Sequence, residues 1–214
     1  MPAARPPDLA ARLLLGERES LLPILRRTPA EAFDRPTVCS GWTVRDVLAH
    51  EAAALTRVAE GNVHRFTPRE NEADVEERRP WPLEDVLAEL EAGYERAAPV
   101  ITAAGGRLDG VALGEWVHGG DVREALGEPG AYESEGAWDA LALLAERSRQ
   151  RGVPTTRVRL PDCELWLGSE DAAGMPAELV TDLPTLIRLC SGRNPDPARY
   201  TLTGADPAQY LLFS

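Results

Sequence analysis

Apolar residues recur at helical spacing through the first two thirds of the chain. Between residues 9 and 25 leucine and isoleucine fall three or four positions apart, which predicts an amphipathic helix that Asp8 caps and Pro23 kinks or breaks. A short turn is expected over 29–33. A second helix is predicted from Thr43, which forms a capping-box pair with Asp46, to about Gly61. Further helices are predicted over about 83–104, 109–126 and 135–151. Four long helices joined by short loops indicate a bundle.

The segment between the second and third of these helices has a different character. Residues 62–82 are polar, rich in charge and proline, and show no periodicity. Such a composition predicts a mobile loop.

After residue 155 the pattern changes from helical spacing to alternation. Strands are predicted over 156–160, 163–167, 177–180 and 200–203, with a helix over 183–190 and a short closing helix over 206–213. The fold class is therefore predicted as α+β, with a helical bundle over residues 1–150 followed by a small α+β domain over 151–214.

The composition of the chain limits the classes of function that it can have. A chain of 214 residues with 43 % hydrophobic content can build one large or two small packed domains. The net charge of −12 disfavours nucleic acid as a partner, because phosphate binding needs clustered positive charge. The three cysteines are too few for a disulfide framework and are expected as small buried hydrophobes in a reducing cytoplasm. The chain has no apolar run long enough for a signal peptide or a membrane span, so no membrane partner is expected.

Two of the three histidines stand in the least generic stretches, at His50 and His118. Both lie on predicted helices, and Glu115 precedes His118 by three residues, which places the two side chains on one helical face. Two imidazoles, one carboxylate and an open position are the ligand set of a catalytic divalent-metal site. The alternative is that His50 bonds a backbone carbonyl and Glu115 is solvated. The remaining histidine, His64, is expected at the surface.

Both histidine segments resemble those of the mycothiol-dependent maleylpyruvate isomerase family, part of the DinB-like metalloenzyme superfamily. In that family a serine-glycine-tryptophan stretch, here residues 40–42, leads into a helix that ends at a metal-binding histidine, as at His50. A later histidine is followed by an aspartate and an arginine, as His118 is by Asp121 and Arg123. Residues 189–193 and 204–206 also resemble the family's sterol-carrier-like α+β domain.

The acidic ligand departs from the family pattern. The family usually places it four residues before the histidine, where Gly114 stands here, whereas Glu115 lies at three. The two spacings differ by about 100° of rotation in a helix of roughly 3.6 residues per turn. Glu115 is the ligand if the helix is locally tightened or bulged; otherwise Asp121 or a water takes the vacant place.

The resemblance implies a thiol-dependent transferase or isomerase that acts on a small electrophilic substrate. It implies a divalent metal, with zinc favoured, held by His50, Glu115 and His118, and mycothiol as the low-molecular-weight thiol cosubstrate. Two alternatives stay open: a non-catalytic small-molecule-binding or interaction module with a degenerate metal site, and a metal-dependent hydrolase. The oligomeric state is also open.

Four further residues are candidates around the metal. As a catalytic residue, Asp121 would orient an imidazole, or instead form a salt bridge with Arg123 or Arg96. Arg193 would bind an anionic substrate across the domain boundary, or lie in solvent. Trp42 and Trp116 are candidates for cofactor binding, although both are also suited to packing the bundle.

Overall fold

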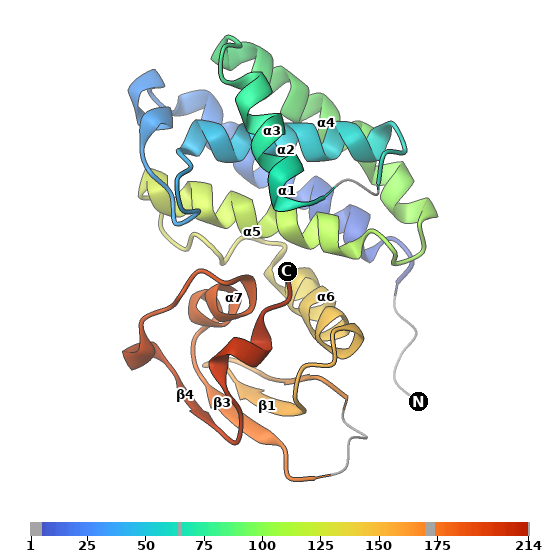
Figure 1. Ribbon diagram of the computed structural model, residues 1–214, viewed down its shortest axis with the longest axis vertical. Helices are drawn as coiled ribbons and strands as arrows, with labels where there is room; N and C mark the ends of the chain where they lie inside the picture. The colour runs from blue at the N-terminus through green and yellow to red at the C-terminus, as the bar shows by residue number, and fades with distance from the viewer. Residues whose placement is uncertain (1–5, 64–65, 170–173, 214) are drawn as a thin grey trace. The chain divides into compact units, whose positions relative to one another are not determined.

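A computed structural model of the chain describes residues 6–63, 66–169 and 174–213 (Figure 1). It divides into two compact units, Met1–Gly136 and Ala137–Ser214. The predicted fold class, a helical region followed by a small α+β domain, is confirmed. The sequence placed the boundary after residue 150, at the end of α6 (Ala137–Gln150). This helix packs against the sheet of the second unit and therefore groups with it.

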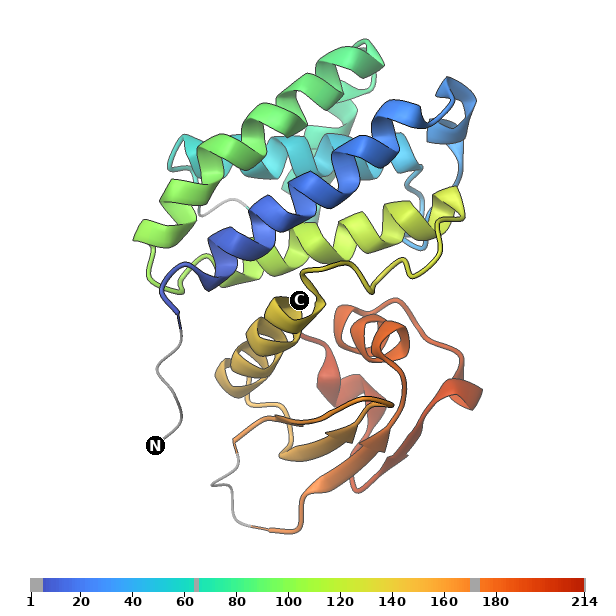
Figure 2. The same cartoon turned by 180° about the vertical axis from the view of Figure 1, so that it is seen from behind.

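The first unit is a bundle of four long helices, as the periodicity predicted. These are α1 (Leu9–Arg27), α2 (Val44–Ala59), α4 (Leu83–Ala103) and α5 (Asp109–Leu126), with a short 3-10 helix, η1 (Ala30–Asp34), after α1. Both α1 and α2 pack against α4 and α5 (Figure 2). Each helix buries its apolar face, with Leu14, Leu48, Leu90 and Leu113 fully enclosed. Within the described ranges, no helix is both long enough and apolar enough to cross a membrane.

The sequence predicted side-chain caps at the starts of two helices, and the structure has one of them. The capping box before α2 is present: Thr43 Oγ1 accepts from the Asp46 backbone N–H at 3.2 Å, and the Thr43 N–H donates to Asp46 Oδ2 at 3.0 Å. Asp8 stands at the N-cap of α1 but makes no side-chain cap bond. Of the kink or break predicted at Pro23, the break is wrong, because α1 runs through this residue, and the kink stays a prediction. Buried leucines on both sides of Pro23 hold the helix together.

The predicted loop over 62–82 is also wrong, because it contains α3 (Pro68–Arg78). This helix begins with a capping box between Thr67 and Glu70 and is held by polar contacts. Arg78 Nε donates to Glu89 Oε2 at 2.6 Å, and Asp74 forms an ion pair with Arg57. Among its residues only Val75 and Arg78 are buried, so the apolar stripe that identifies a helix in sequence is missing.

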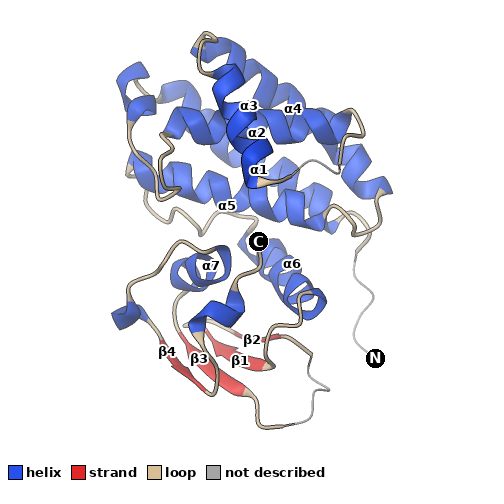
Figure 3. Ribbon diagram, viewed as in Figure 1, coloured by secondary structure: helices blue, strands red, loops and turns tan. Residues whose placement is uncertain are grey.

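The second unit combines two helices with a four-stranded sheet (Figure 3). Its strands are β1 (Thr156–Arg159), β2 (Glu164–Leu167), β3 (Ala177–Val180) and β4 (Thr201–Thr203), in the order β2-β1-β3-β4. Strand β1 runs antiparallel to β2 and parallel to β3, and β4 is antiparallel to β3. Helix α7 (Leu183–Ser191) follows β3, and a short 3-10 helix, η2 (Pro197–Arg199), precedes β4. The predicted closing helix over 206–213 is reduced to one 3-10 turn, η3 (Pro207–Tyr210).

Candidate metal centre

The two predicted histidines lie side by side within the bundle. His50 is near the middle of α2 and only 7 % exposed. His118 is on α5, and the centroids of the two rings are 5.1 Å apart in an edge-on arrangement. The capping box at Thr43 fixes where α2 begins, and so fixes the face on which His50 lies.

The turn before α2 brings a third polar side chain to this place. Residues Pro36 and Thr43 form a bridge that closes the turn. Inside it, Thr37 Oγ1 accepts from the Cys39 N–H at 3.1 Å and donates to the Trp42 carbonyl at 2.9 Å. These bonds fix both Cys39 and Trp42 relative to the start of α2.

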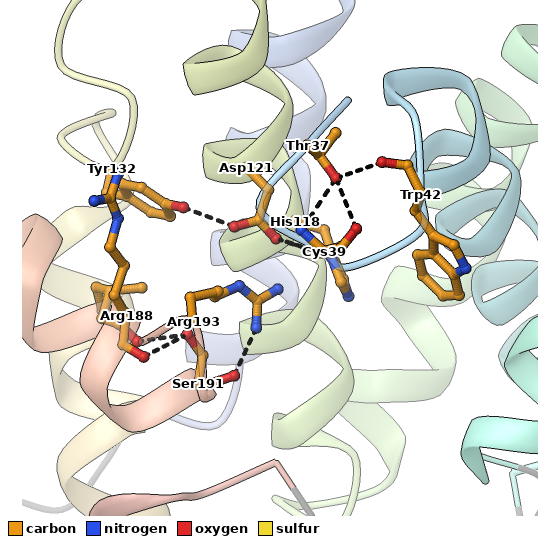
Figure 4. Close-up of polar contacts among 10 residues, drawn as sticks. Thr37, Cys39, Trp42, His118, Asp121, Tyr132, Arg188, Ser191 and Arg193 are labelled. Carbon is orange, nitrogen blue, oxygen red and sulfur yellow. Dashed lines mark hydrogen bonds and ion pairs between the residues drawn. The ribbon is translucent and has the colours of Figure 1, made fainter. Parts of the chain in front are cut away.

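Cys39, His118 and Asp121 form a compact cluster (Figure 4). Cys39 Sγ lies 3.7 Å from His118 Nδ1 and donates to Asp121 Oδ2 at 3.2 Å. His118 Nδ1 is 3.2 Å from the same Asp121 oxygen. Ligand atoms about 2.0–2.3 Å from a tetrahedral zinc ion stand roughly 3.3–3.7 Å from one another. The separation between sulfur and nitrogen lies within this range, and the two separations to Asp121 Oδ2 lie about 0.1 Å below it, so small shifts of the side chains would accommodate zinc.

The sequence did not indicate Cys39 as a site residue. The cysteines were expected as inert hydrophobes, and the histidine and aspartate that Cys39 meets lie 79 and 82 positions away. The clue in the sequence to a role for Cys39 was that it directly precedes the serine-glycine-tryptophan stretch at residues 40–42. Cys190 matches the expectation: it is fully buried, and burial raises the pKa of its thiol to about 12.

Asp121 is held from its other side by a tyrosine. The Tyr132 hydroxyl donates to Asp121 Oδ1 at 2.6 Å, and both side chains are buried (Figure 4). The tyrosine ring can approach α5 because residue 120 is glycine: a Cβ there would lie 2.3 Å from Tyr132 Cδ1. Of the two contacts considered for Asp121, the structure has the one with an imidazole, whereas Arg123 pairs with Glu17. The catalytic role of Asp121 stays a prediction.

The two candidate tryptophans occupy different places. Trp42 stands beside the histidines, with ring centroids 5.0 Å from His50 and 6.5 Å from His118, and its Nε1 donates to Glu72 of α3. Trp116 is fully buried, and its Nε1 donates to Ser134 Oγ at 2.7 Å. Trp42 thus borders the cluster, while Trp116 packs in the bundle interior. Their roles in cofactor binding stay predictions.

Glu115, the predicted acidic ligand, lies on the same helix as His118 but outside the cluster. It is 3 % exposed, and burial together with the neighbouring Glu17 raises its pKa well above the usual range. Within the described parts of the chain, Cys39, His118 and Asp121 are the one set of three or more potential ligands whose atoms all lie within 4.8 Å of each other. The ligand set His50, Glu115 and His118 stays a prediction.

Two candidate residues remain, Arg193 and His64. Arg193 belongs to the second unit, directly after the C-cap Gly192 of α7, where its Nη1 donates to the Ser191 carbonyl at 2.9 Å. Its predicted contact with substrate is not tested by this geometry. His64 lies outside the described residues.

Two solved structures resemble most of the chain. They are crystal structures of a mycothiol-dependent maleylpyruvate isomerase and of a mutant of it. Each alignment covers 94 % of this chain and 95 % of the solved chain, with a TM-score of 0.58. The sequence identity is 14 % for the first structure and 13 % for the mutant. At that identity the similarity establishes the fold.

One curated protein matches part of the chain at the sequence level. The tRNA-specific 2-thiouridylase MnmA of Methylobacterium radiotolerans is 34 % identical over 137 residues. The match covers 61 % of this chain and 32 % of that protein, so the chain spans about a third of the length of the relative.

A family profile matches the helical unit. The profile described as the mycothiol maleylpyruvate isomerase N-terminal domain aligns with residues 14–128, which is more than half of the chain. This range includes all of α2, α4 and α5, most of α1, and the cluster of Cys39, His118 and Asp121. The chain therefore belongs to the mycothiol maleylpyruvate isomerase N-terminal domain family.

Proposed function

We propose that this protein is a metal-dependent transferase or isomerase that uses a low-molecular-weight thiol, mycothiol, to act on a small electrophilic substrate in a reducing cytoplasm. The observation that carries the proposal is the convergence of Cys39, His118 and Asp121 beside His50. Membership of the family supports it, since the solved structures that resemble the chain are of a mycothiol-dependent isomerase.

The donor set favours zinc over the hard cations. Thiolate and imidazole are borderline or soft ligands, and the pairing of sulfur, nitrogen and one carboxylate oxygen is typical of zinc. When bound, zinc would supply a positive charge that lowers the pKa of the cosubstrate thiol and holds it as thiolate at neutral pH.

His118 belongs to both ligand sets considered. In the cluster its Nδ1 faces Cys39 and Asp121. In the set with His50 and Glu115 the other ring nitrogen would bind the metal, and Nδ1–H would donate to Asp121, an arrangement common around metal-bound histidines. We favour the first set because its three ligand atoms lie within 4.8 Å of one another.

The surrounding side chains have defined tasks in this proposal. Tyr132 holds Asp121 by one oxygen and leaves the other toward Cys39 and His118. The indole of Trp42 forms an apolar wall beside both imidazoles, which limits the access of water to a reactive thiolate. Arg193 remains our candidate for binding the negative group of the substrate.

The first test concerns the metal. Purified wild-type protein is expected to bind zinc, and the cobalt-substituted form is expected to have a sulfur-to-cobalt charge-transfer band. Cys39→Ala should abolish the band and reduce metal content, while Cys163→Ala, a matched change in the second unit, should leave both unchanged. If Cys39→Ala keeps its metal and His50→Ala loses it, the set of His50, Glu115 and His118 is correct instead.

The second test concerns the thiol. Calorimetry with mycothiol and with its S-methyl derivative, on metal-loaded and metal-stripped protein, is expected to give binding only when both the metal and the free sulfur are present. Binding that ignores both would exclude a thiol-dependent enzyme. It would favour the small-molecule-binding or interaction module.

A further inference from the structure

The interior of the bundle contains a second group of polar side chains. Each of the four long helices contributes one: Glu17 from α1, Glu51 from α2, Tyr94 from α4 and Glu115 from α5. Their exposed fractions are 1 %, 0 %, 0 % and 3 %. We call these four residues the interior cluster. Three buried glutamates in the interior of one bundle are unusual, because burying a charge is costly unless it is compensated.

Several oxygens of the interior cluster have no hydrogen-bond partner among the described residues. These are both carboxylate oxygens of Glu51, one oxygen each of Glu17 and Glu115, and the hydroxyl of Tyr94. A buried polar atom without a partner costs about 1–3 kcal/mol, and more when it is charged. Five such oxygens, carried by four helices that pack against one another, point to a ligand that they share.

The charges in the cluster balance only in part. Arg123 donates to Glu17 Oε1 at 2.6 Å and to Ser20 Oγ at 2.9 Å, so Glu17 has its counter-ion. No ion pair joins Glu51 or Glu115 to a basic side chain within the described ranges. Arg57, the basic group that acts on Glu115 most directly, is already paired with Asp74. Glu51 and Glu115 therefore have no basic partner there, and in their ionised forms they would carry the charge that one divalent cation balances.

The members of the cluster are close enough to influence one another. After burial itself, the charge of Glu115 and then that of Glu17 raise the pKa of Glu51. The pKa of the Tyr94 hydroxyl is raised by burial and then by Glu51, Glu17 and Glu115 in that order.

We propose that the interior cluster binds a hydrated hard divalent cation of the Mg²⁺ or Mn²⁺ class, at a site separate from Cys39, His118 and Asp121. All its donors are oxygens, which suit hard cations and disfavour zinc in competition with the sulfur and nitrogen of the other site. The three glutamates do not bring their oxygens within 4.8 Å of one another as a set. A Mg²⁺-like ion suits such widely spaced oxygens, because it binds directly through only one or two carboxylates and keeps several waters that reach the others. Glu51 and Glu115 would contact the ion, and its waters would reach Glu17 and Tyr94.

The inference does not need the thiol-dependent activity, but it rests on the choice of Cys39, His118 and Asp121 over the zinc ligand set that includes Glu115. A cation here would neutralise charge between all four helices and so stabilise the bundle whether or not the protein is an enzyme. It can therefore be tested by stability and binding alone.

The experiment uses the full chain, stripped of metal with a chelator, and Mn²⁺ as the probe. The temperature of thermal unfolding is expected to rise with Mn²⁺ concentration, and electron paramagnetic resonance gives the dissociation constant. Glu51→Gln keeps the shape of the side chain but removes its charge, and it should weaken Mn²⁺ binding at least tenfold. Glu76→Gln, an exposed change on α3, should leave binding unchanged.

A second pair of variants separates the two sites and guards against a folding defect. Tyr94→Phe removes only the hydroxyl and should weaken Mn²⁺ binding severalfold, which provides the test if Glu51→Gln does not fold. Cys39→Ala should keep the Mn²⁺ response while losing the cobalt band described above. The proposal is overturned if Mn²⁺ does not stabilise the wild type, if Tyr94→Phe and Glu51→Gln bind it as the wild type does, or if Cys39→Ala abolishes the response.

Discussion

Tyr132→Phe tests whether the tyrosine hydroxyl positions Asp121. The substitution keeps the ring that packs over Gly120 and removes the donor that lies 2.6 Å from Asp121 Oδ1. A hydrogen bond to a charged, buried acceptor contributes about 1.5–3 kcal/mol, and its loss leaves that acceptor desolvated. For a chain of this size, a loss of about 2 kcal/mol lowers the unfolding temperature by roughly 4–8 °C.

The same change should act on the metal centre. Asp121 Oδ2, which faces Cys39 and His118, is oriented by the bond that Tyr132 makes to the other oxygen. Removal of groups that orient metal ligands typically reduces metal affinity about 10–100-fold. Competition with a chromophoric chelator measures that loss, and scanning calorimetry of metal-free protein measures the stability.

Tyr94→Phe is the matched control in metal-free protein. Tyr94 is as buried as Tyr132, but its hydroxyl has no partner among the described residues, so its removal should be neutral or slightly stabilising. Equal effects of the two substitutions on stability, or unchanged zinc affinity in Tyr132→Phe, would refute the positioning role.

Three further predictions concern the interior of the bundle. Gly120→Ala should destabilise by about 1–3 kcal/mol because the new Cβ collides with an aromatic ring, whereas Gly114→Ala, with nothing within 4 Å, should be neutral or stabilising in the same urea titrations. Arg123→Met should cost about 3–5 kcal/mol because it leaves Glu17 buried without its counter-ion, and adding Glu17→Gln should recover part of that loss in a double-mutant cycle. In metal-free protein the pKa of Glu51 is raised above its ordinary value of 4.5, so the folded state keeps a proton that the unfolded state releases above about pH 4.5. The free energy of unfolding should therefore fall as the pH rises above that value, and Glu51→Gln should make this fall smaller.

Local patterns in the sequence determined much of this protein. The four bundle helices follow from apolar residues spaced three or four apart, and the start of α2 follows from the pair Thr43 and Asp46. The convergence of His50 and His118 was also predictable, because both occupy helix positions in recognisable motifs. The helices and the start of α2 depend on side chains a few residues apart, whose relative positions are fixed by helix geometry. The meeting of the two histidines, which lie on different helices, was expected from the resemblance of their motifs to a known family.

Other features were decided only by tertiary structure. Helix α3 carries no apolar stripe, and its ion pairs join it to residues of α2 and α4. The contacts of Cys39 with His118 and Asp121, and the burial of Glu51 among other carboxyl groups, also depend on how α2 and α5 pack. Such contacts join residues far apart in sequence, and no periodicity within either segment encodes them. The sequence therefore indicated which helices form and which histidines meet, while the packing of those helices decided which thiol and which carboxylates lie beside them.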